Sequence, residues 1–416
     1  MEKMDMHGRN EYLKLLRGRY FKARTKREKT EVLDEYCRNT GQNRKYVIGK
    51  IWSDGGKPKE PRMREKRYDG DVKAVLAEVW EIFDCPCGQR LKPVLETEVE
   101  RLRELGEIHC SDETVQKLKE IGSATIDRKL RREKEVKHRE NRKGHPKPGS
   151  QLKQKIAIRL TDWDTSEVGN VEIDLVEHCG SSPEGPFLNT VSTTEIYSGW
   201  WSGLPIMGKS QDATFQALKE IRQNSSFGWK SMDSDNGSEF INDVLEKYCS
   251  REKIEFTRSR PGKKNDNAYI EGKNWTHVRK VVGYLRYDTA AEMQILYGLY
   301  QGEMGLYMNF FRPVMKLVSK ERIGGKVKRK YDKPRTPYER LVESGQIPEQ
   351  VRLQLEATYL SLNPAELKRK IDAKLNELYQ TYQAKNGGQE VHPQKKSKPC
   401  SVRFPMIQQV PVRSGS

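Results

Sequence analysis

Residues 131–155 cannot form part of a packed core, and they divide the chain. This segment, RREKEVKHRENRKGHPKPGSQLKQK, holds ten Lys and Arg, three Glu and almost no apolar side chain. Such a composition buries too little apolar surface to offset the entropy lost on ordering. We therefore expect folded regions on both sides of a basic linker at residues 136–165. A linker of this kind either follows a phosphate backbone or is simply solvated.

Length and charge favour several domains and an anionic partner. The chain has 416 residues, with 77 Lys and Arg against 59 Asp and Glu, so its formal charge is +18. This length exceeds one ordinary domain, and this charge favours nucleic acid over a small acidic substrate. No apolar run approaches membrane-spanning length, and the start MEKMDMHGRN lacks the apolar segment of a secretory signal. We expect double-stranded DNA as partner, no membrane association, no small-molecule cofactor, and a cytoplasmic, nucleoid-associated location.

Residues 1–60 have the pattern of a helix-turn-helix DNA-binding unit. Thr25 and Glu28 have capping-box spacing, Gly41 ends a helix, and Asn43 begins the next one. A recognition helix presents polar groups to a DNA groove while its apolar side packs inward. An ordinary helical hairpin with a solvated face is the alternative. The candidate DNA-binding residues on the second helix are Asn43, Arg44, Lys45 and Lys50.

Residues 61–135 indicate a second helical DNA-binding unit. Ser111 is a candidate helix cap, and Gly122 separates that helix from a more basic one. Arg128 and Lys129 on the basic helix are candidate DNA contacts. Two units in tandem would read a longer DNA site than one, because a single helix reaches only a few base pairs.

The pattern changes to alternating apolar and polar residues after residue 166, where we expect an α/β domain at 166–300. Three strands in hairpin order followed by strand–helix alternation predict a mixed sheet with helices on its faces. The expected strands are 170–178, 187–195, 199–207, 227–234 and 254–259. The expected helices are 210–223, 239–249, 265–283 and 290–311.

Three acidic residues of this region are candidates for one site. Asp174 is a charge in the middle of an otherwise β-forming run, so it needs a partner. Asp235 follows a later strand at a sharp turn, with Asp233 on the same face as the reserve choice, and Glu271 lies in the first turns of a helix beside the sheet. Converging carboxylates repel each other without a cation, and their oxygens suit Mg²⁺ or Mn²⁺.

The order of these motifs resembles the DDE catalytic core of retroviral integrases and of integrase-type insertion-sequence transposases. A single DNG would be a weak signal, but several motifs in order are specific. Over residues 20–345 the chain is most similar to a group of bacterial transposases with integrase catalytic domains, through the segments VEIDLVEHCG, DSDNGSEFIN, FTRSRPGKKNDNAYIEGKNW, NFFRPVMKLV and KVKRKYDKPRTPYERL.

The resemblance implies a multidomain protein with an RNase H-like core, N-terminal all-α helix-turn-helix units and a helical, basic C-terminal extension. It implies that Asp174, Asp235 and Glu271 are catalytic and bind two Mg²⁺ or Mn²⁺ ions, with Asp174 bridging both. It also implies 3′-end cleavage of an insertion sequence followed by strand transfer into target DNA, carried out by a homo-multimer. An RNase H-like nuclease without strand transfer and a catalytically silent, sequence-specific DNA-binding regulator remain alternatives.

Residues around the predicted site could contact DNA. Lys263, Lys264, Lys273 and Arg279 are candidates for phosphate contacts. Retroviral relatives tend to carry a lysine four residues after the glutamate, where this chain has Trp275, which would either stack on a base or belong to the core. His178 is more typical of a structural histidine than of a metal ligand.

The C-terminal region at residues 301–386 is basic and helical. Residues 312–335 form a basic strip that either lies along DNA or is a solvated connector, and residues 364–386 have the pattern of an amphipathic helix. We expect the tail at residues 387–416 to be disordered.

Overall fold

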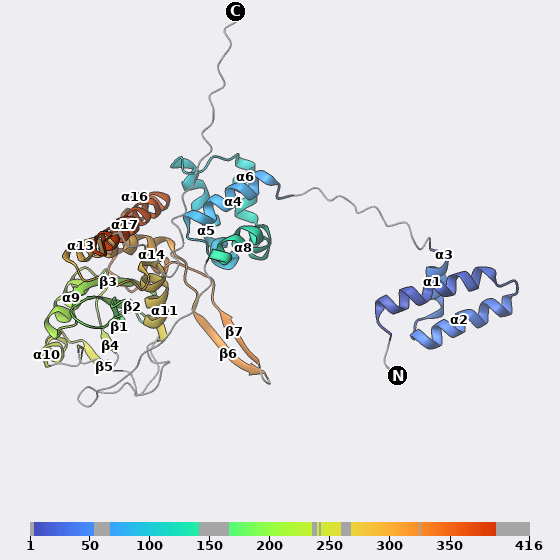
Figure 1. The fold of residues 1–416 in the computed structure, drawn as a ribbon, viewed down its shortest axis with the longest axis horizontal. Helices are drawn as coiled ribbons and strands as arrows, with labels where there is room; N and C mark the ends of the chain where they lie inside the picture. The colour runs from blue at the N-terminus through green and yellow to red at the C-terminus, as the bar shows by residue number, and fades with distance from the viewer. Residues whose placement is uncertain are drawn as a thin grey trace, which may run out of the picture. The chain divides into compact units, whose positions relative to one another are not determined.

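The computed structural model describes residues 4–53, 67–140, 166–234, 239–240, 243–258, 268–323 and 326–387. The chain forms two compact units, residues 1–67 and 68–416, and each is described by itself (Figure 1). The predicted sites at Asp235, Lys263 and Lys264, the linker beyond Glu140 and the tail beyond Gly387 lie outside the described residues.

The first unit contains three helices, α1 (Met6–Lys22), α2 (Lys26–Thr40) and α3 (Arg44–Trp52). The predicted capping box is present, because the Thr25 hydroxyl and the Glu28 carboxylate each accept from the other residue's backbone N–H. Gly41 ends α2 with φ of +67°, a conformation that costs glycine little. The buried core of this unit consists of Leu16, Tyr20, Val32, Leu33, Tyr36, Val47 and Ile51.

A block of helices opens the second unit. It contains α4 (Gly70–Ile82), α5 (Gly88–Glu104), α6 (Asp112–Glu120), α7 (Ser123–Lys129) and α8 (Arg131–Glu140). Ser111 caps α6 by accepting from the Thr114 N–H, as its position predicted. Residues 136–140 of the expected linker continue α8, and the bounds of the linker stay a prediction. Arg, Lys and Glu are good helix formers even where they bury nothing.

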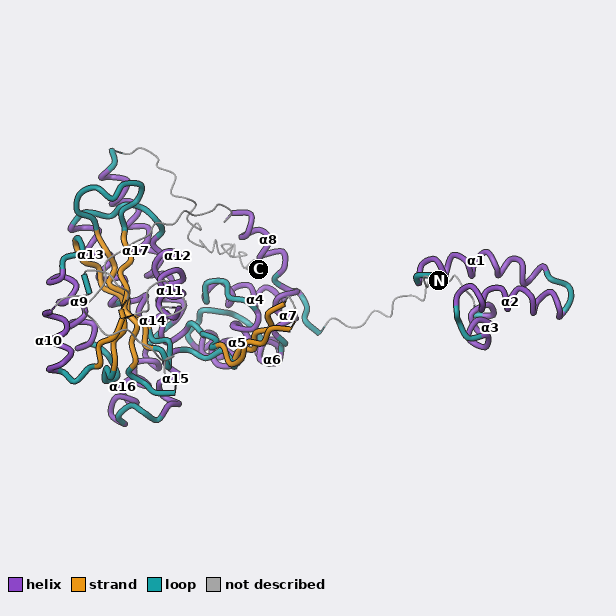
Figure 2. The backbone as a smooth tube through the Cα atoms, turned by 90° about the horizontal axis from the view of Figure 1, so that it is seen from below, coloured by secondary structure: helices purple, strands orange, loops and turns teal. Residues whose placement is uncertain are grey.

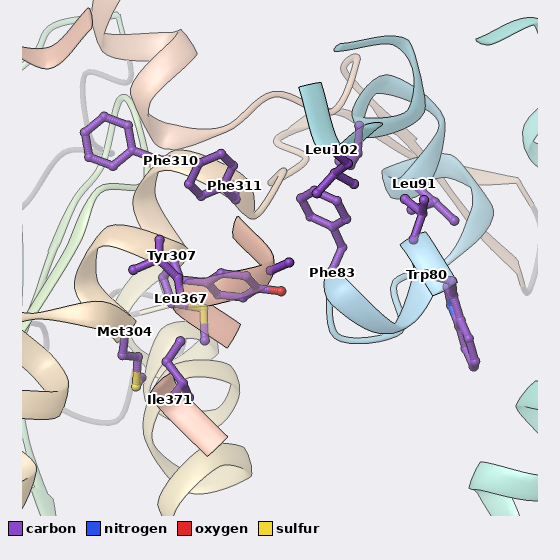
Figure 3. Close-up of a cluster of buried hydrophobic side chains, with 14 of the residues drawn as sticks. Trp80, Phe83, Leu91, Leu102, Met304, Tyr307, Phe310, Phe311, Leu367 and Ile371 are labelled. Atoms are coloured by element: carbon purple, nitrogen blue, oxygen red, sulfur yellow. The ribbon is translucent and has the colours of Figure 1, made fainter. Parts of the chain in front are cut away.

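This helical block shares a hydrophobic core with the C-terminal helices. Figure 3 shows Trp80, Phe83, Leu91 and Leu102 of the block together with residues of α14 and α17. Polar contacts join the same parts, since Arg101 donates to the carbonyl oxygen of Tyr359 at 2.6 Å and Asn363 donates to Glu107 at 2.7 Å. The block is therefore packed against the rest of the second unit.

The centre of the second unit is a five-stranded mixed sheet. Its strands are β1 (Asn170–Glu177), β2 (Leu188–Glu195), β3 (Trp201–Met207), β4 (Ser231–Ser234) and β5 (Glu255–Arg258), in the order β3-β2-β1-β4-β5. The pairs β1–β2 and β2–β3 are antiparallel, whereas β1–β4 and β4–β5 are parallel. The mixed sheet predicted from the sequence is confirmed, although β4 begins four residues later than expected.

Helices cover both faces of this sheet. Figure 2 shows α9 (Gln211–Gln223) and α10 (Asp243–Arg251) on one side, and α11 (Ala268–Lys273) and α12 (Lys280–Val282) on the other. Val171 and Ile173 of β1 pack into the core under α9 and α10, whereas Val176 belongs to the larger core on the opposite face. A π-helical segment, η1 (Asn274–Arg279), joins α11 to α12.

The chain continues after the sheet with helices and one hairpin. The elements are α13 (Ala290–Gln301), α14 (Glu303–Phe311), β6 (Leu317–Ile323), β7 (Lys326–Tyr331), α15 (Pro337–Ser344), α16 (Glu349–Ser361) and α17 (Pro364–Lys385). The basic strip expected at residues 312–335 is thus an antiparallel hairpin, β6–β7. Two glycines separate its strands in the sequence, and a Gly-Gly pair between two β-forming runs is a recognised hairpin signal. Among the described residues, every helix is too short or too polar to cross a membrane.

Candidate functional site

The central strand β1 presents two carboxylates on one face of the sheet. Side chains alternate along a strand, so Glu172 and Asp174 share a face while Val171 and Ile173 occupy the other. Glu172 is completely buried, and Asp174 is half-buried. Both carboxylates face the segment that contains α11 and η1, as their hydrogen bonds establish.

Glu172 anchors the beginning of α11. Its Oε2 accepts from the backbone N–H of Ile270 at 2.8 Å. The first N–H groups of a helix have no partner within that helix, and here a carboxylate from the neighbouring strand supplies one. Sequence reasoning missed Glu172, although its spacing of two from Asp174 placed both on the same face.

Asp174 is held by the same helical segment. Its Oδ2 accepts from the side-chain amide of Asn274 at 2.6 Å, and its Oδ1 accepts from the backbone N–H of Leu175 at 2.8 Å. Asn274 is the first residue of η1, and single π-helical turns recur at functional sites. Its role was also missed, and the only signal was its position three residues after Glu271.

Glu271 lies between these two anchor points. Its neighbour Ile270 is bound to Glu172, and Asn274 in the following turn is bound to Asp174. The Glu271 side chain itself is exposed. The fold therefore brings Asp174 within about one helical turn of Glu271, although 96 residues, 175 to 270, lie between them in the sequence.

The strand that leads to Asp235 pairs directly with β1. Glu172 is opposite Asp233, and Ile173 is opposite Ser234. Ser234 is the last described residue before Asp235, and Ile173 is the residue before Asp174. The reserve candidate Asp233 is fully buried and accepts from the Thr257 hydroxyl, so it lies inside the sheet and is a poor metal ligand.

The carboxylates of Asp174, Asp235 and Glu271 are of the kind that bind a hard divalent cation. Carboxylate oxygens are the ligands that Mg²⁺ and Mn²⁺ prefer, and a carboxylate has about four acceptor positions. The hydrogen bonds from Asn274 and Leu175 to Asp174 therefore do not exclude a metal ion. Within the described part of the chain, no three His, Cys, Asp or Glu residues are placed to hold a metal. The proposed set needs Asp235 as well.

Lys273 does not occupy the surface position expected of a DNA contact. Its side chain is only 9% exposed, and its Nζ has no hydrogen-bond partner among the described residues. Burial, together with the charges of Arg90, Arg312 and Arg340, lowers the pKa of Lys273 to about 7. The helix turns this lysine inward, and a phosphate contact by Lys273 stays a prediction.

Arg279 is half-buried at the end of η1. Its guanidinium lies over the Tyr284 ring, 4.8 Å from the ring centre, and burial lowers the pKa of Arg279. It follows Glu271 by eight residues, which corresponds to roughly 12 Å along a helix. A phosphate contact by Arg279 stays a prediction.

Trp275 is 45% exposed, so the interpretation as a core aromatic is wrong, and stacking on a base stays a prediction.

His178 is fully buried, with Nε2 2.8 Å from the Thr190 hydroxyl. Burial and the charge of Arg279 lower the pKa of His178 to about 3, so the ring is neutral. A structural role fits this burial and stays a prediction, and the buried Nδ1 has no hydrogen-bond partner among the described residues.

The residues at α3 that are predicted to contact DNA differ in whether their side chains already have partners within the protein. Asn43 accepts from the Lys45 N–H as the helix cap, and Arg44 pairs with Asp34. Lys50 donates to Asn10 at 3.3 Å. The side chain of Lys45 is exposed.

The two candidates in the helical block differ in the same way. Arg128 is exposed and donates to the Thr125 hydroxyl at 2.9 Å. Lys129 is half-buried and donates to the backbone carbonyl of Tyr68. The geometry of α7 thus favours Arg128 over Lys129 as a surface contact.

In the described part of the chain, a mixed five-stranded sheet carries helices on both faces. No family model matches the chain. Over 339 residues it is 33% identical to the uncharacterized protein y4rM of Sinorhizobium fredii (strain NBRC 101917 / NGR234), which covers 81% of this chain and 96% of that protein. The chain belongs to the same family as this uncharacterized protein.

Solved structures similar to this chain include retroviral integrase cores. The catalytic core domain of BIV integrase is 16% identical with a TM-score of 0.27, covering 42% of this chain and 95% of that chain. The catalytic core domain of HTLV-2 integrase, solved in complex with magnesium in a dimeric form, is 10% identical with a TM-score of 0.26. The match covers 35% of this chain and 88% of that chain. Because both TM-scores are low, we base the functional proposal on the strand order and the side chains.

Proposed function

We propose that the protein is a DDE-type transposase that cleaves the 3′ ends of an insertion sequence and joins them to target DNA. The observation that carries the proposal is the hydrogen bond from Asn274 to Asp174, which binds the Glu271 helix to the central strand. The register of β4, with Ser234 opposite Ile173, supports a place for Asp235 in the same site. Asp174, Asp235 and Glu271 are then the catalytic, metal-binding residues.

Asp174, Asp235 and Glu271 would hold two Mg²⁺ or Mn²⁺ ions, which would activate the attacking oxygen and stabilise the leaving oxygen of a phosphodiester. Asn274 orients the Asp174 carboxylate, in the manner of residues that position metal ligands from behind. Glu172 fixes the first turn of α11 and thereby the direction of Glu271.

DNA is the proposed substrate and partner, held by a homo-multimer. The formal charge of +18 supports binding to a phosphate backbone. The exposed Lys45 on α3 and Arg128 on α7 are proposed contacts, and the exposed Trp275 is a platform for an unstacked base close to Glu271. A multimer follows because two transposon ends must be joined to one target.

The test is an end-joining assay with the full-length protein and its two carboxylate variants, Asp174→Asn and Glu271→Gln. The substrates are the DNA ends that flank the gene, a random duplex of equal length, and a target plasmid with Mg²⁺. The wild type is expected to cleave and join the flanking ends, and each variant to lose both activities while still binding them. Asp212→Asn, an exposed carboxylate in the first turn of α9, is the matched control and should retain activity.

Each other outcome identifies an alternative. Cleavage of the flanking ends and random DNA without joining would indicate a plain nuclease. Specific binding by the wild type with neither reaction in Mg²⁺ or Mn²⁺ would indicate a DNA-binding regulator. Full joining activity in Asp174→Asn would refute the assignment of the catalytic site.

A further inference from the structure

We propose that a buried junction in the second unit binds a small oxyanion of the phosphate class. The junction lies at the end of α11, where Lys273 and Val314 both lie against Gly199 and where Arg340 donates to the Val314 carbonyl oxygen at 3.0 Å. Its cationic and imidazole groups, called here the junction cluster, are Arg90, Lys273, His277, Arg312 and Arg340. This inference does not rest on the proposed DNA chemistry.

Two members of the cluster are buried with a nitrogen that lacks a partner. Lys273 is 9% exposed and His277 is 5% exposed. Neither Lys273 Nζ nor His277 Nε2 has a hydrogen-bond partner within the described ranges, whereas His277 Nδ1 is 2.7 Å from the Thr276 hydroxyl. Buried polar groups in folded proteins are normally satisfied, so each exception needs an explanation such as an ion.

The arginines add further unpaired donors from other parts of the chain. The Nε atoms of Arg90 on α5 and Arg340 on α15 are also buried without a partner in the described part of the protein. Arg90 is half-buried, so the cluster extends toward the outside along α5. Three donor nitrogens, contributed by α11, α5 and α15, therefore have no acceptor among the described residues. The neutral His277 ring donates from Nδ1 to the Thr276 hydroxyl, which itself donates to the Gly272 carbonyl, so its Nε2 is an acceptor.

Positive charge exceeds negative charge at the junction. The charges that act on Lys273 are those of Arg90, Arg312 and Arg340, and those that act on His277 are Lys273, Arg312 and Arg90. Among the described residues, two of these cations have a carboxylate partner: Arg312 is 3.2 Å from Asp84, and Arg340 is 2.7 Å from Asp332. Arg90 and Lys273 have no such ion pair there, so an anion would complete the charge balance.

The donor set defines the class of ligand. Guanidinium and ammonium groups that approach from different directions match an oxyanion with several acceptor oxygens. Lys273 Nζ lies close to the backbone after β2, because a Cβ atom built on Gly199 would lie 3.6 Å from this nitrogen and 3.5 Å from Val314 Cγ2.

A phosphate group at this junction could be free inorganic phosphate or part of a DNA backbone. The burial of Lys273 and His277 favours the free ion, because a duplex cannot enter a site this enclosed. The ion would join the helical block to the core and the C-terminal region, and ligands that bind only the folded state stabilise it.

The test measures binding of inorganic phosphate to the full-length protein by calorimetry, with sodium chloride of equal ionic strength as reference. We expect one phosphate per chain and a thermal unfolding midpoint that rises with low millimolar phosphate. Lys273→Met should weaken binding by about 10- to 100-fold, as the loss of a charge-assisted hydrogen bond predicts. Lys247→Met, an exposed lysine on α10, is the control and should bind as the wild type does.

Lys273→Met has a second expected effect that a surface lysine would not produce. Removing a buried, unpaired cation should raise the unfolding midpoint in phosphate-free buffer while removing the response to phosphate. If this variant does not fold, Arg90→Met, at the outer side of the cluster, should show the same loss of phosphate binding. No phosphate binding by the wild type, or unchanged binding in the folded variant, would overturn the proposal.

A competition experiment distinguishes the two sources of phosphate. If adding a DNA duplex displaces bound inorganic phosphate from the wild type, the DNA backbone enters the junction. If phosphate binds equally well to the DNA complex, the ligand is the free ion. Both results support an oxyanion site at the junction, and they differ only in what supplies the oxyanion.

Discussion

Asn274 donates a hydrogen bond from Nδ2 to Oδ2 of Asp174 at 2.6 Å, across 100 residues of sequence. This bond connects the first residue of a π-helical segment to the middle of the central strand. A carboxylate that must hold a metal ion in a fixed direction benefits from a donor of this kind, because the donor selects one rotamer. Asn274 is thus a positioning residue for the proposed catalytic centre.

Asn274→Ala is expected to raise the Mg²⁺ concentration needed for half-maximal end joining by about 10- to 100-fold, the usual cost of losing a residue that orients a metal ligand. The measurement is a Mg²⁺ titration of the joining reaction at saturating DNA. Asn224→Ala, at the exposed end of α9, should leave the titration unchanged. If Asn274→Ala reduced the rate at saturating Mg²⁺ but left the half-maximal concentration unchanged, the orienting role would be wrong.

Glu172→Ala should destabilise the protein by about 1–3 kcal/mol, because it leaves the buried Ile270 N–H without its acceptor. Glu172→Gln keeps an acceptor oxygen at that position and should cost less. Urea unfolding of the three proteins measures the difference. Glu167→Ala, which removes an exposed ion pair with Lys230, is the control and should change the free energy of unfolding by less than about 1 kcal/mol. Equal effects of the Ala and Gln variants at Glu172 would contradict the anchoring role.

The strands of the sheet could be predicted because their period-2 alternation is a local property. The segment around Asp174 has it, and β1, β2 and β3 begin and end within two residues of the prediction. The capping box of α2 was predictable for the same reason, since all its contacts lie within four residues. The parallel strand β4 is only four residues long, and its start is set by pairing with β1, which no local pattern encodes.

The contacts of the candidate site depend on residues remote in the sequence. Asn274 looks like an ordinary helical residue until its partner on β1 is known. Most lysines lie on the surface, but the Lys273 side chain is only 9% exposed, and charges of α5 and of the region around residue 340 act on it. These segments come from about 180 residues before it and about 70 after it, and only the tertiary fold brings them together.

Lys45→Ala should weaken binding to the flanking DNA ends. In a plot of log affinity against log salt concentration, the magnitude of the slope should fall by about one, because one phosphate contact is lost. The reason is that Lys45 is exposed on α3, whereas Asn43 and Arg44 are engaged within the protein. Fluorescence anisotropy at several salt concentrations gives both quantities. Lys14→Ala, an exposed lysine of α1 in the same unit, is the control. An equal loss in both variants would mean that α3 has no special role.

The stability of the protein should depend on pH through His178, whose pKa burial lowers from 6.5 to about 3. Between these values the unfolded chain binds a proton that the folded chain does not. The free energy of unfolding therefore falls as the pH drops from 6.5 toward 3, by up to about 1.4 kcal/mol per pH unit for this group. His277 contributes in the same direction, because burial and neighbouring cations lower its pKa as well.

His178→Gln should remove the part of the pH dependence of the free energy of unfolding that comes from the His178 proton. The Gln side chain can still form a hydrogen bond with Thr190. Urea unfolding between pH 4 and 7 measures the slope, which should be lower in the variant than in the wild type by up to about 1.4 kcal/mol per pH unit. His109→Gln, which replaces an exposed histidine, should keep the slope of the wild type. If His178→Gln lost stability equally at every pH, the ring would be important for packing alone, and the acid dependence would have to come from other groups.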